Sequence, residues 1–313
     1  MNKYESMGNL YSLDGQIPSS FFRASVQSID EVNFGKTQFR GNKQWKEFFG
    51  LSELKEVVSI TLREQIEFDT IQRNGIAFEF SKLKNHKEIN DFANKYGLLG
   101  IKPPDIWMKM ELSELKKRWG NGICLLLKTG FSYCEPLQLW EYYINQIRNI
   151  LKLYRALVNI HRGDLGANEL EDKYLRIGFF HNGGYMVEWG DGQITGCTIS
   201  ETTAEKANWI EIAREVLISS VINKSKTVNH FAANIIETGK PPLGFTIQES
   251  KYTNILLNTI YYDIWELISN NEPVHICGNP NCKLPFKKVK RQQYCSNACK
   301  QEAYRIRKSH SPN

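Results

Sequence analysis

Four of the seven cysteines in this 313-residue chain lie close together near its C-terminus. They form the pattern C-x4-C-x12-C-x3-C and are Cys277, Cys282, Cys295 and Cys299. A tetrahedral zinc site takes its ligands as two close pairs, each held by a tight turn. The sequence Gly-Asn-Pro-Asn inside the first pair favours such a turn. The spacing therefore predicts a structural zinc ion (Zn²⁺) held by four thiolates.

Other uses of these thiols fit the pattern less well. If the cysteines were simply buried or redox-active, there would be no reason for one pair to precede and one pair to follow an insert of hairpin length. A catalytic zinc site keeps one position open, whereas four cysteines close the coordination shell. We recognise no set of residues elsewhere in the sequence that is typical of acid–base or nucleophilic catalysis. We therefore expect no enzymatic activity and assign no catalytic residue.

Positive charge gathers in the same segment. The whole chain has a formal net charge of +6, yet residues 283–313 hold nine basic residues and one acidic residue, Glu302, for a net charge of +8. The first 282 residues are therefore net −2. Cations on a rigid scaffold suit phosphate contacts, because each neutralised phosphate releases counterions. We expect nucleic-acid contacts, with DNA favoured over RNA, from eight residues: Lys287, Lys288, Lys290, Arg291, Lys300, Arg305, Arg307 and Lys308.

The rest of the sequence predicts an α+β body in which helices dominate. Apolar residues recur at helical spacing over residues 86–97, 136–161 and 253–268. Residues 176–199 hold short apolar runs split by Asn-Gly-Gly and Asp-Gly, which predicts a small antiparallel β meander. Two shorter patterns add detail. Alternation from Ile76 predicts a strand, and Thr202 with Glu205 predicts a capping box at the start of a helix.

We divide the chain into three parts. Residues 1–104 form an N-terminal mixed α/β region, and residues 105–272 form a helical domain with the β meander. Residues 273–313 form the C-terminal module, a treble-clef-like zinc finger with a hairpin between the cysteine pairs and a basic helix after Cys299. A chain of this length can bury a large core without a metal, so the metal site serves the module alone.

Neither a secretory signal nor a membrane span is expected. The first 15 residues lack the apolar core of a signal peptide. The most apolar segment, residues 255–268, is interrupted by Asn258, Asp263 and Glu266. The expected location is the cytoplasm, where thiols stay reduced and clustered cysteines bind metal rather than pair as disulfides.

About 40 residues at the C-terminus resemble a known family. The stretch CGNPNC…YCSNACKQEAYRIRK is similar to the C-terminal zinc finger of the CGNR type, found in bacterial proteins regarded as transcription regulators. The four-residue gap of the first pair and the aromatic-Cys-Ser of the second pair match that family. Cys299 is followed here by Lys-Gln-Glu in place of the family's Gly-Asn-Arg. The resemblance implies a treble-clef fold, a structural zinc ion and a regulatory role.

Two functions fit these features. The first is a cytoplasmic bacterial DNA-binding protein, a transcription regulator whose body senses a signal or a partner. The second is a protein-interaction component of a stress, toxin or phage-defence system, in which zinc holds a docking surface for a protein partner or a second copy of the chain. Salt separates the two, because affinity for DNA falls steeply as salt rises.

Overall fold

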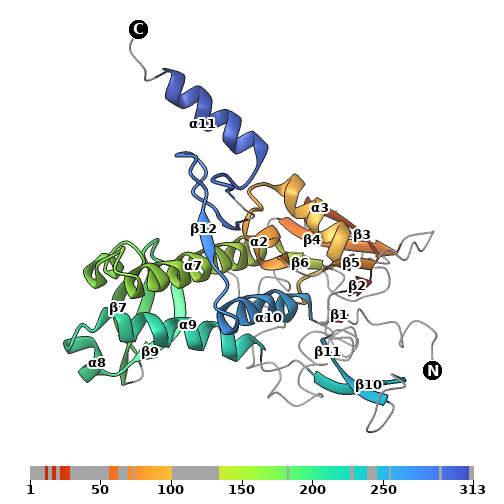
Figure 1. The fold of residues 1–313 in the computed structure, drawn as a ribbon, viewed down its shortest axis with the longest axis horizontal. Coiled ribbons are helices and arrows are strands. Elements are labelled where there is room, and N and C mark those ends of the chain that lie inside the picture. The colour runs from red at the N-terminus through yellow and green to blue at the C-terminus, as the bar shows by residue number, and fades with distance from the viewer. Residues whose placement is uncertain are drawn as a thin grey trace. The chain divides into compact units, whose positions relative to one another are not determined.

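A computed structural model of the chain describes residues 11–12, 16–18, 22–28, 56–62, 70–72, 75–100, 134–181, 183–225, 229–237, 245–253, 255–288 and 291–309. These residues form an α+β fold, and every ladder between two of their strands is antiparallel (Figure 1). No helix in these ranges is both long enough and apolar enough to cross a lipid bilayer. The residues divide into two compact units.

The first unit comprises Met1–Asn74, Leu83–Tyr143 and Thr227–Thr259. Its described strands form small sheets in the orders β1-β11-β10, β2-β5 and β3-β4-β6. Their bounds are β1 Tyr11–Ser12, β2 Gln16–Pro18, β3 Phe22–Ser28, β4 Glu56–Leu62, β5 Thr70–Gln72, β6 Cys134–Pro136, β10 Asn229–Glu237 and β11 Phe245–Thr253.

Helix α3 (His86–Tyr96) packs against β3 in this unit. The Asn85 side chain caps its start by accepting from the Glu88 amide, and Gly97 ends it with a positive φ of 90°. Asn94 then fixes the helix to the strand. Its amide group accepts from the Ala24 backbone N–H at 2.9 Å and donates to the Ala24 carbonyl at 3.1 Å. The helix predicted over residues 86–97 is confirmed.

A buried carboxylate lies where β6 leads into the long helix α7 (Leu137–His161). The residue is Glu135, which is 1% exposed. Its oxygens accept from the backbone N–H of Leu99 at 3.0 Å, from that of Gly100 at 2.6 Å and from the Trp140 indole at 2.8 Å. One side chain therefore ties the segment after α3 to the first turn of α7.

The second unit comprises Gly75–Lys82, Ile144–Lys226 and Ile260–Asn313. It contains the rest of α7, most of α10, and the predicted meander in the order β7-β8-β9. The bounds of its other elements are α2 Ile76–Ser81, η2 Ala167–Leu170, β7 Leu175–His181, β8 Gly184–Trp189, β9 Ile194–Ile199, α8 Glu201–Glu205, α9 Trp209–Ser225, α10 Leu256–Ser269, β12 Val274–Ile276, β13 Pro285–Lys287 and α11 Asn297–Ser309.

The meander and the long helix share a core. Trp189, at the end of β8, is 1% exposed, and its indole donates to the Gln146 amide oxygen on α7 at 2.7 Å. Helix α9 packs against β9. The predicted helices over residues 136–161 and 253–268 and the predicted meander are confirmed.

The strand predicted from Ile76 is wrong, because this segment is the short helix α2. Its start is capped from α10, where the Asp263 carboxylate accepts from the Ala77 backbone N–H at 2.9 Å. The side chains expected to alternate between core and solvent are buried on almost all sides, including those of Ala77 and Phe78. A short apolar run buried on all sides carries no periodicity that separates helix from strand.

The capping box predicted at Thr202 is also misplaced. Ser200 caps the five-residue helix α8, its side chain accepting from the Thr203 amide at 3.2 Å. Ala207 then takes a left-handed φ of 45°, which ends that helix. The long helix α9 begins after Asn208, whose side chain accepts from the Glu211 amide and donates to the Glu211 carboxylate.

Domain boundaries at 104 and 272 stay predictions. Residues 101–133 lie outside the described ranges, and the C-terminal module belongs to the same compact unit as the meander.

Replacing Glu135 with Gln should destabilise the first unit. The Gln side chain has one acceptor oxygen in place of two, and its NH₂ group cannot accept a hydrogen bond. At least one of the three buried N–H donors that now bind Glu135 is therefore left without an acceptor. We expect a loss of about 1–3 kcal/mol in the free energy of unfolding, measured by denaturant titration. Glu141→Gln, at an exposed position further along α7, is the matched control. Equal stability of the two variants would contradict the role given to Glu135.

Candidate metal centre

A short hairpin positions the first cysteine pair. Strands β12 and β13 pair antiparallel, with Ile276 opposite Pro285. The Cys277 backbone N–H extends this ladder by donating to the Leu284 carbonyl at 2.9 Å. The strands of this hairpin flank the first cysteine pair. The hairpin predicted within the insert between the two pairs is therefore misplaced, because the described residues of that insert contain a single strand, β13.

The second pair is positioned by the start of α11. Cys295 precedes the helix and Cys299 lies in its first turn, where the Cys299 backbone N–H donates to the Ser296 hydroxyl at 3.2 Å. The two pairs are joined by the Gly278 N–H, which donates to the Gln293 carbonyl at 3.0 Å. A β-carbon at Gly278 would lie 3.3 Å from that oxygen, so the close approach favours glycine.

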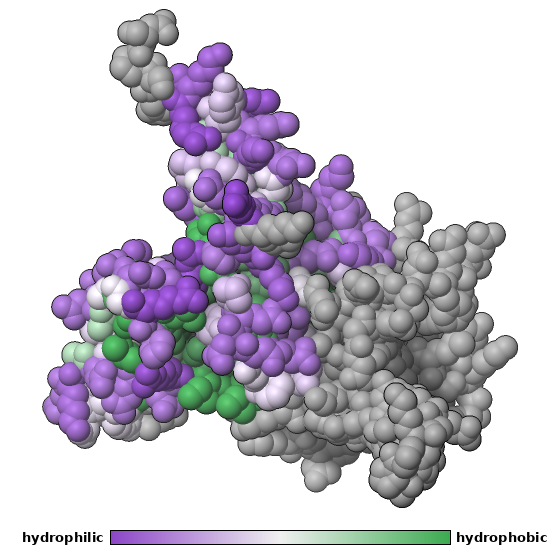
Figure 2. All heavy atoms as spheres, viewed as in Figure 1, coloured by the Kyte–Doolittle hydropathy of each residue, from purple (hydrophilic) through white to green (hydrophobic). Residues whose placement is uncertain are grey.

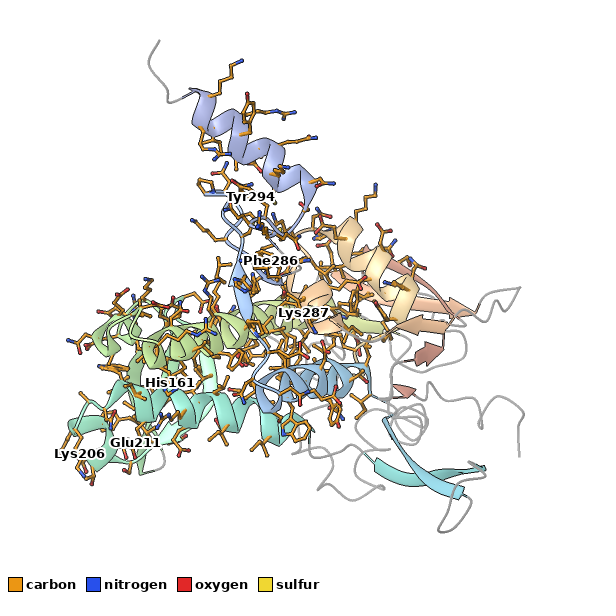
Figure 3. The ribbon with its side chains drawn as sticks, in the orientation of Figure 1. His161, Lys206, Glu211, Phe286, Lys287 and Tyr294 are labelled. Atoms are coloured by element: carbon orange, nitrogen blue, oxygen red, sulfur yellow. The ribbon has the colours of Figure 1, made fainter. Side chains whose placement is uncertain are left out.

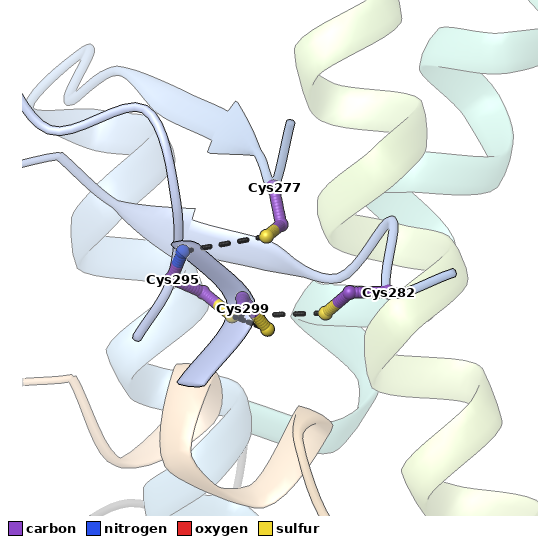
Figure 4. A group of neighbouring side chains, drawn as sticks. All are labelled: Cys277, Cys282, Cys295 and Cys299. Carbon is purple, nitrogen blue, oxygen red and sulfur yellow. Dashed lines mark hydrogen bonds between the residues drawn. The ribbon is translucent and has the colours of Figure 1, made fainter. Parts of the chain in front are cut away.

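All four sulfur atoms converge on one point (Figure 4). They lie within 4.8 Å of one another, with 3.7 Å between Cys282 and Cys295 and 3.5 Å between Cys295 and Cys299. These distances exceed a disulfide bond of about 2.05 Å, and the four cysteines are free. A tetrahedral ion with metal–sulfur bonds of about 2.3 Å places its ligands about 3.8 Å apart. The four cysteines could therefore hold one metal ion.

Crowding gives three of the thiols, Cys282, Cys295 and Cys299, unequal acidities. Burial, followed by hydrogen bonds among the thiols, raises the pKa of Cys295, and burial also raises the pKa of Cys282. Burial acts in the same direction on Cys299, but hydrogen bonds with Ser296, Cys295 and Cys282 outweigh it and lower the pKa of that thiol to about 7. Cys299 therefore ionises more readily than Cys282 and Cys295. A metal cation bound here would supply the positive charge that holds all four as thiolates.

A polar latch joins the first cysteine pair to α11. The Glu302 carboxylate accepts from the side-chain amides of Asn279 and Asn281, each at 2.8 Å. Asn279 is fully buried, and its own oxygens accept from the backbone N–H groups of Asn281 and Cys282. Sequence reasoning treated Glu302 only as the single acidic charge in a basic segment. Its separation of 23 residues from Asn279 gave no local signal that the two residues meet.

The predicted nucleic-acid contacts are not equally placed. Lys287 forms an ion pair with Glu272, so its charge is partly neutralised (Figure 3). Lys290 lies outside the described residues. The other six are exposed: Lys288, Arg291, Lys300, Arg305, Arg307 and Lys308.

Helix α11 separates a buried side from a cationic side. Ala303 is 3% exposed, whereas Tyr304 is 61% exposed. Residues three and four apart share a helical face, so Lys300, Tyr304, Arg307 and Lys308 project together. We call these four residues the cationic face. The side of α11 toward the viewer in Figure 2 is hydrophilic.

A polar hollow lies beside the second cysteine pair. It has a volume of about 270 Å³ and is lined in part by Arg291, Tyr294, Ser296 and Lys300. Two cations at a concave surface form a place where an anionic group can bind.

Purified full-length protein kept reduced should contain one metal ion per chain. Cys282→Ser removes one thiolate and should lower the metal content at least severalfold, measured by elemental analysis after dialysis. Cys197→Ser is the control, since Cys197 is buried in β9 apart from the group. A metal content unaffected by Cys282→Ser would contradict the assignment.

Glu302→Ala should weaken metal binding although Glu302 is not a ligand. Removing the latch frees the turn that carries Cys277 and Cys282, and changes of this kind cost about 10- to 100-fold in metal affinity. Competition with a chelator of known affinity measures the effect. Gln301→Ala, at the neighbouring exposed position, should leave the affinity unchanged. The same affinity in both variants would show that the latch does not support the site.

Comparisons of the chain with models of protein families, with curated proteins and with solved structures find no match. The function of this chain therefore has to be inferred from the geometry and charge of the residues described above.

Proposed function

We propose that the C-terminal module is a treble-clef zinc finger that binds DNA, and that the chain is a bacterial transcription regulator. The observation that carries this proposal is the cationic face of α11, because it is exposed while the single acidic residue of the module, Glu302, is engaged on the other side of the helix. The resemblance to CGNR-type fingers points the same way.

Zinc is the metal that the donor set favours. Four thiolates are soft ligands, which suit zinc and iron rather than magnesium or calcium. Four sulfur atoms within 4.8 Å of one another are spaced to hold a single ion. The order of the elements also supports a treble clef: a cysteine turn within a hairpin, followed by a helix that carries Cys299.

DNA suits this surface for two reasons. Lys300 and Lys308 lie two turns apart on one face of a 13-residue helix, a size that the major groove of B-DNA admits. The polar hollow with Arg291 and Lys300 adds a second place for a phosphate group at the start of the same helix. Tyr304 lies between the cations and can pack on a sugar or a base.

Neutralising two lysines of the cationic face tests the proposal. Full-length protein carrying Lys300→Gln and Lys308→Gln should bind duplex DNA more weakly. Its log–log salt slope should be smaller by about 1.8, which is about 0.9 for each phosphate that the variant no longer neutralises. Gel shifts across a salt series measure both quantities.

The matched control carries Lys87→Gln and Lys206→Gln, an equal change of charge at exposed positions outside the module. Of these two residues, Figure 3 labels Lys206. It should bind like the unmodified protein. Equal weakening in the two double variants would indicate attraction by net charge alone. Absence of DNA binding at low salt, with a protein partner recovered, would favour the interaction-component hypothesis.

A further inference from the structure

A second concave site lies within the second unit, where the meander and α7 meet the hairpin of the C-terminal module. The cavity has a volume of about 510 Å³, which is within the range of small-molecule sites. Lys152 of α7, Lys173 before β7 and Lys283 after the first cysteine pair line it. Three cations from three separate elements therefore face one space.

The single lining carboxylate already has partners. Asp191 accepts from the Asn149 side chain at 2.9 Å and from the Gln193 backbone N–H at 3.1 Å. Lys173 forms an exposed ion pair with Glu169 at 3.2 Å. Both donors to Asp191 are neutral, so this carboxylate keeps its negative charge. With Lys173 paired to Glu169, the charges of Lys152 and Lys283 exceed that of Asp191, and the cavity lining stays net positive.

Two half-buried cations of α7, Lys152 and Arg155, are only partly balanced by anions. Burial, and next the positive charge of Arg148, lowers the pKa of Lys152, and the Asp191 carboxylate offsets this only in part. One turn further along α7, the Nη1 atom of Arg155 is buried and has no hydrogen-bond partner among the described residues. Of these two groups only Lys152 lines the cavity, and an anion bound there would stabilise its ammonium group.

Aromatic side chains provide an apolar wall. Trp189 is fixed by its hydrogen bond to Gln146, and the ring of Tyr174 lies beneath the Lys173 ammonium group at 5.6 Å. Cations beside rigid rings are suited to a ligand that carries both an anionic group and a flat ring.

We propose that this cavity binds a phosphate-bearing small molecule of mononucleotide size, with Lys152 and Lys283 at its phosphate and Tyr174 against its ring. Ile276 and Lys283, which line the cavity, are the residues immediately outside Cys277 and Cys282. The bound molecule would therefore contact both the body of the second unit and the turn that holds the first cysteine pair. The binding step does not depend on the DNA-binding proposal.

Calorimetric titration of full-length, metal-loaded protein without DNA tests this site. AMP should bind saturably with one site per chain, whereas adenosine, which lacks the phosphate, and inorganic phosphate, which lacks the ring, should each bind at least tenfold more weakly. Adenosine or inorganic phosphate binding as tightly as AMP would overturn the assignment, as would the absence of saturable AMP binding.

Variants locate the bound AMP. Lys152→Gln and Lys283→Gln should each weaken AMP binding about tenfold or more, because each removes one charge-assisted hydrogen bond. Lys206→Gln and the Lys300→Gln, Lys308→Gln double variant should bind AMP normally. Unchanged affinity in Lys152→Gln and Lys283→Gln would overturn the proposal, and weaker binding in the double variant would place AMP on the cationic face instead.

Circular dichroism of Lys152→Gln checks that this variant still folds. Lys283 is exposed, so its replacement gives a test that does not depend on the folding of Lys152→Gln.

Discussion

Four sulfur atoms confined within 4.8 Å of one another are the constraint on which the C-terminal module depends. Thiolates at such distances repel, and uncharged thiols make only weak hydrogen bonds. The elements around them are small: two three-residue strands and one helix, with Leu284, Phe286 and Ala303 among their few buried apolar residues. A segment of about 40 residues rarely stabilises itself by such a core. A cation at the centre would remove the repulsion and would join the hairpin to α11.

The contact between the cysteine turn and α11 also determines which charged side chains of the module are exposed. Glu302 turns toward Asn279 and Asn281, so the single acidic side chain of the module holds the cysteine turn against the helix. The basic residues of the cationic face are left on the other side of α11, while Lys287 is directed back to Glu272. The segment has a net charge of +8. One of its positive charges, on Lys287, is therefore paired within the structure, and the charges of the cationic face are exposed. The surface is displayed by the fold of the module and does not follow from composition alone.

Sequence patterns predicted the features that depend on local periodicity or spacing. The helix over residues 137–161, the meander and the meeting of the four cysteines belong to this class. The features that were missed depend on contacts distant in sequence. Helix α2 is capped by Asp263 across 186 residues, and Glu135 accepts from the Leu99 and Gly100 amides. The hairpin was misplaced because its strands are only three residues long. The lysine-lined cavity could not be foreseen, since its walls come from segments more than 100 residues apart.

Removal of the metal from a preformed complex with DNA tests the central claim most directly. A chelator is titrated into full-length protein bound to labelled duplex, and metal release and DNA release are recorded together. If the metal holds the cationic face in a form that binds phosphate, the two curves should coincide, while most of the far-ultraviolet helical signal persists. DNA that stays bound after the metal has left would contradict the account.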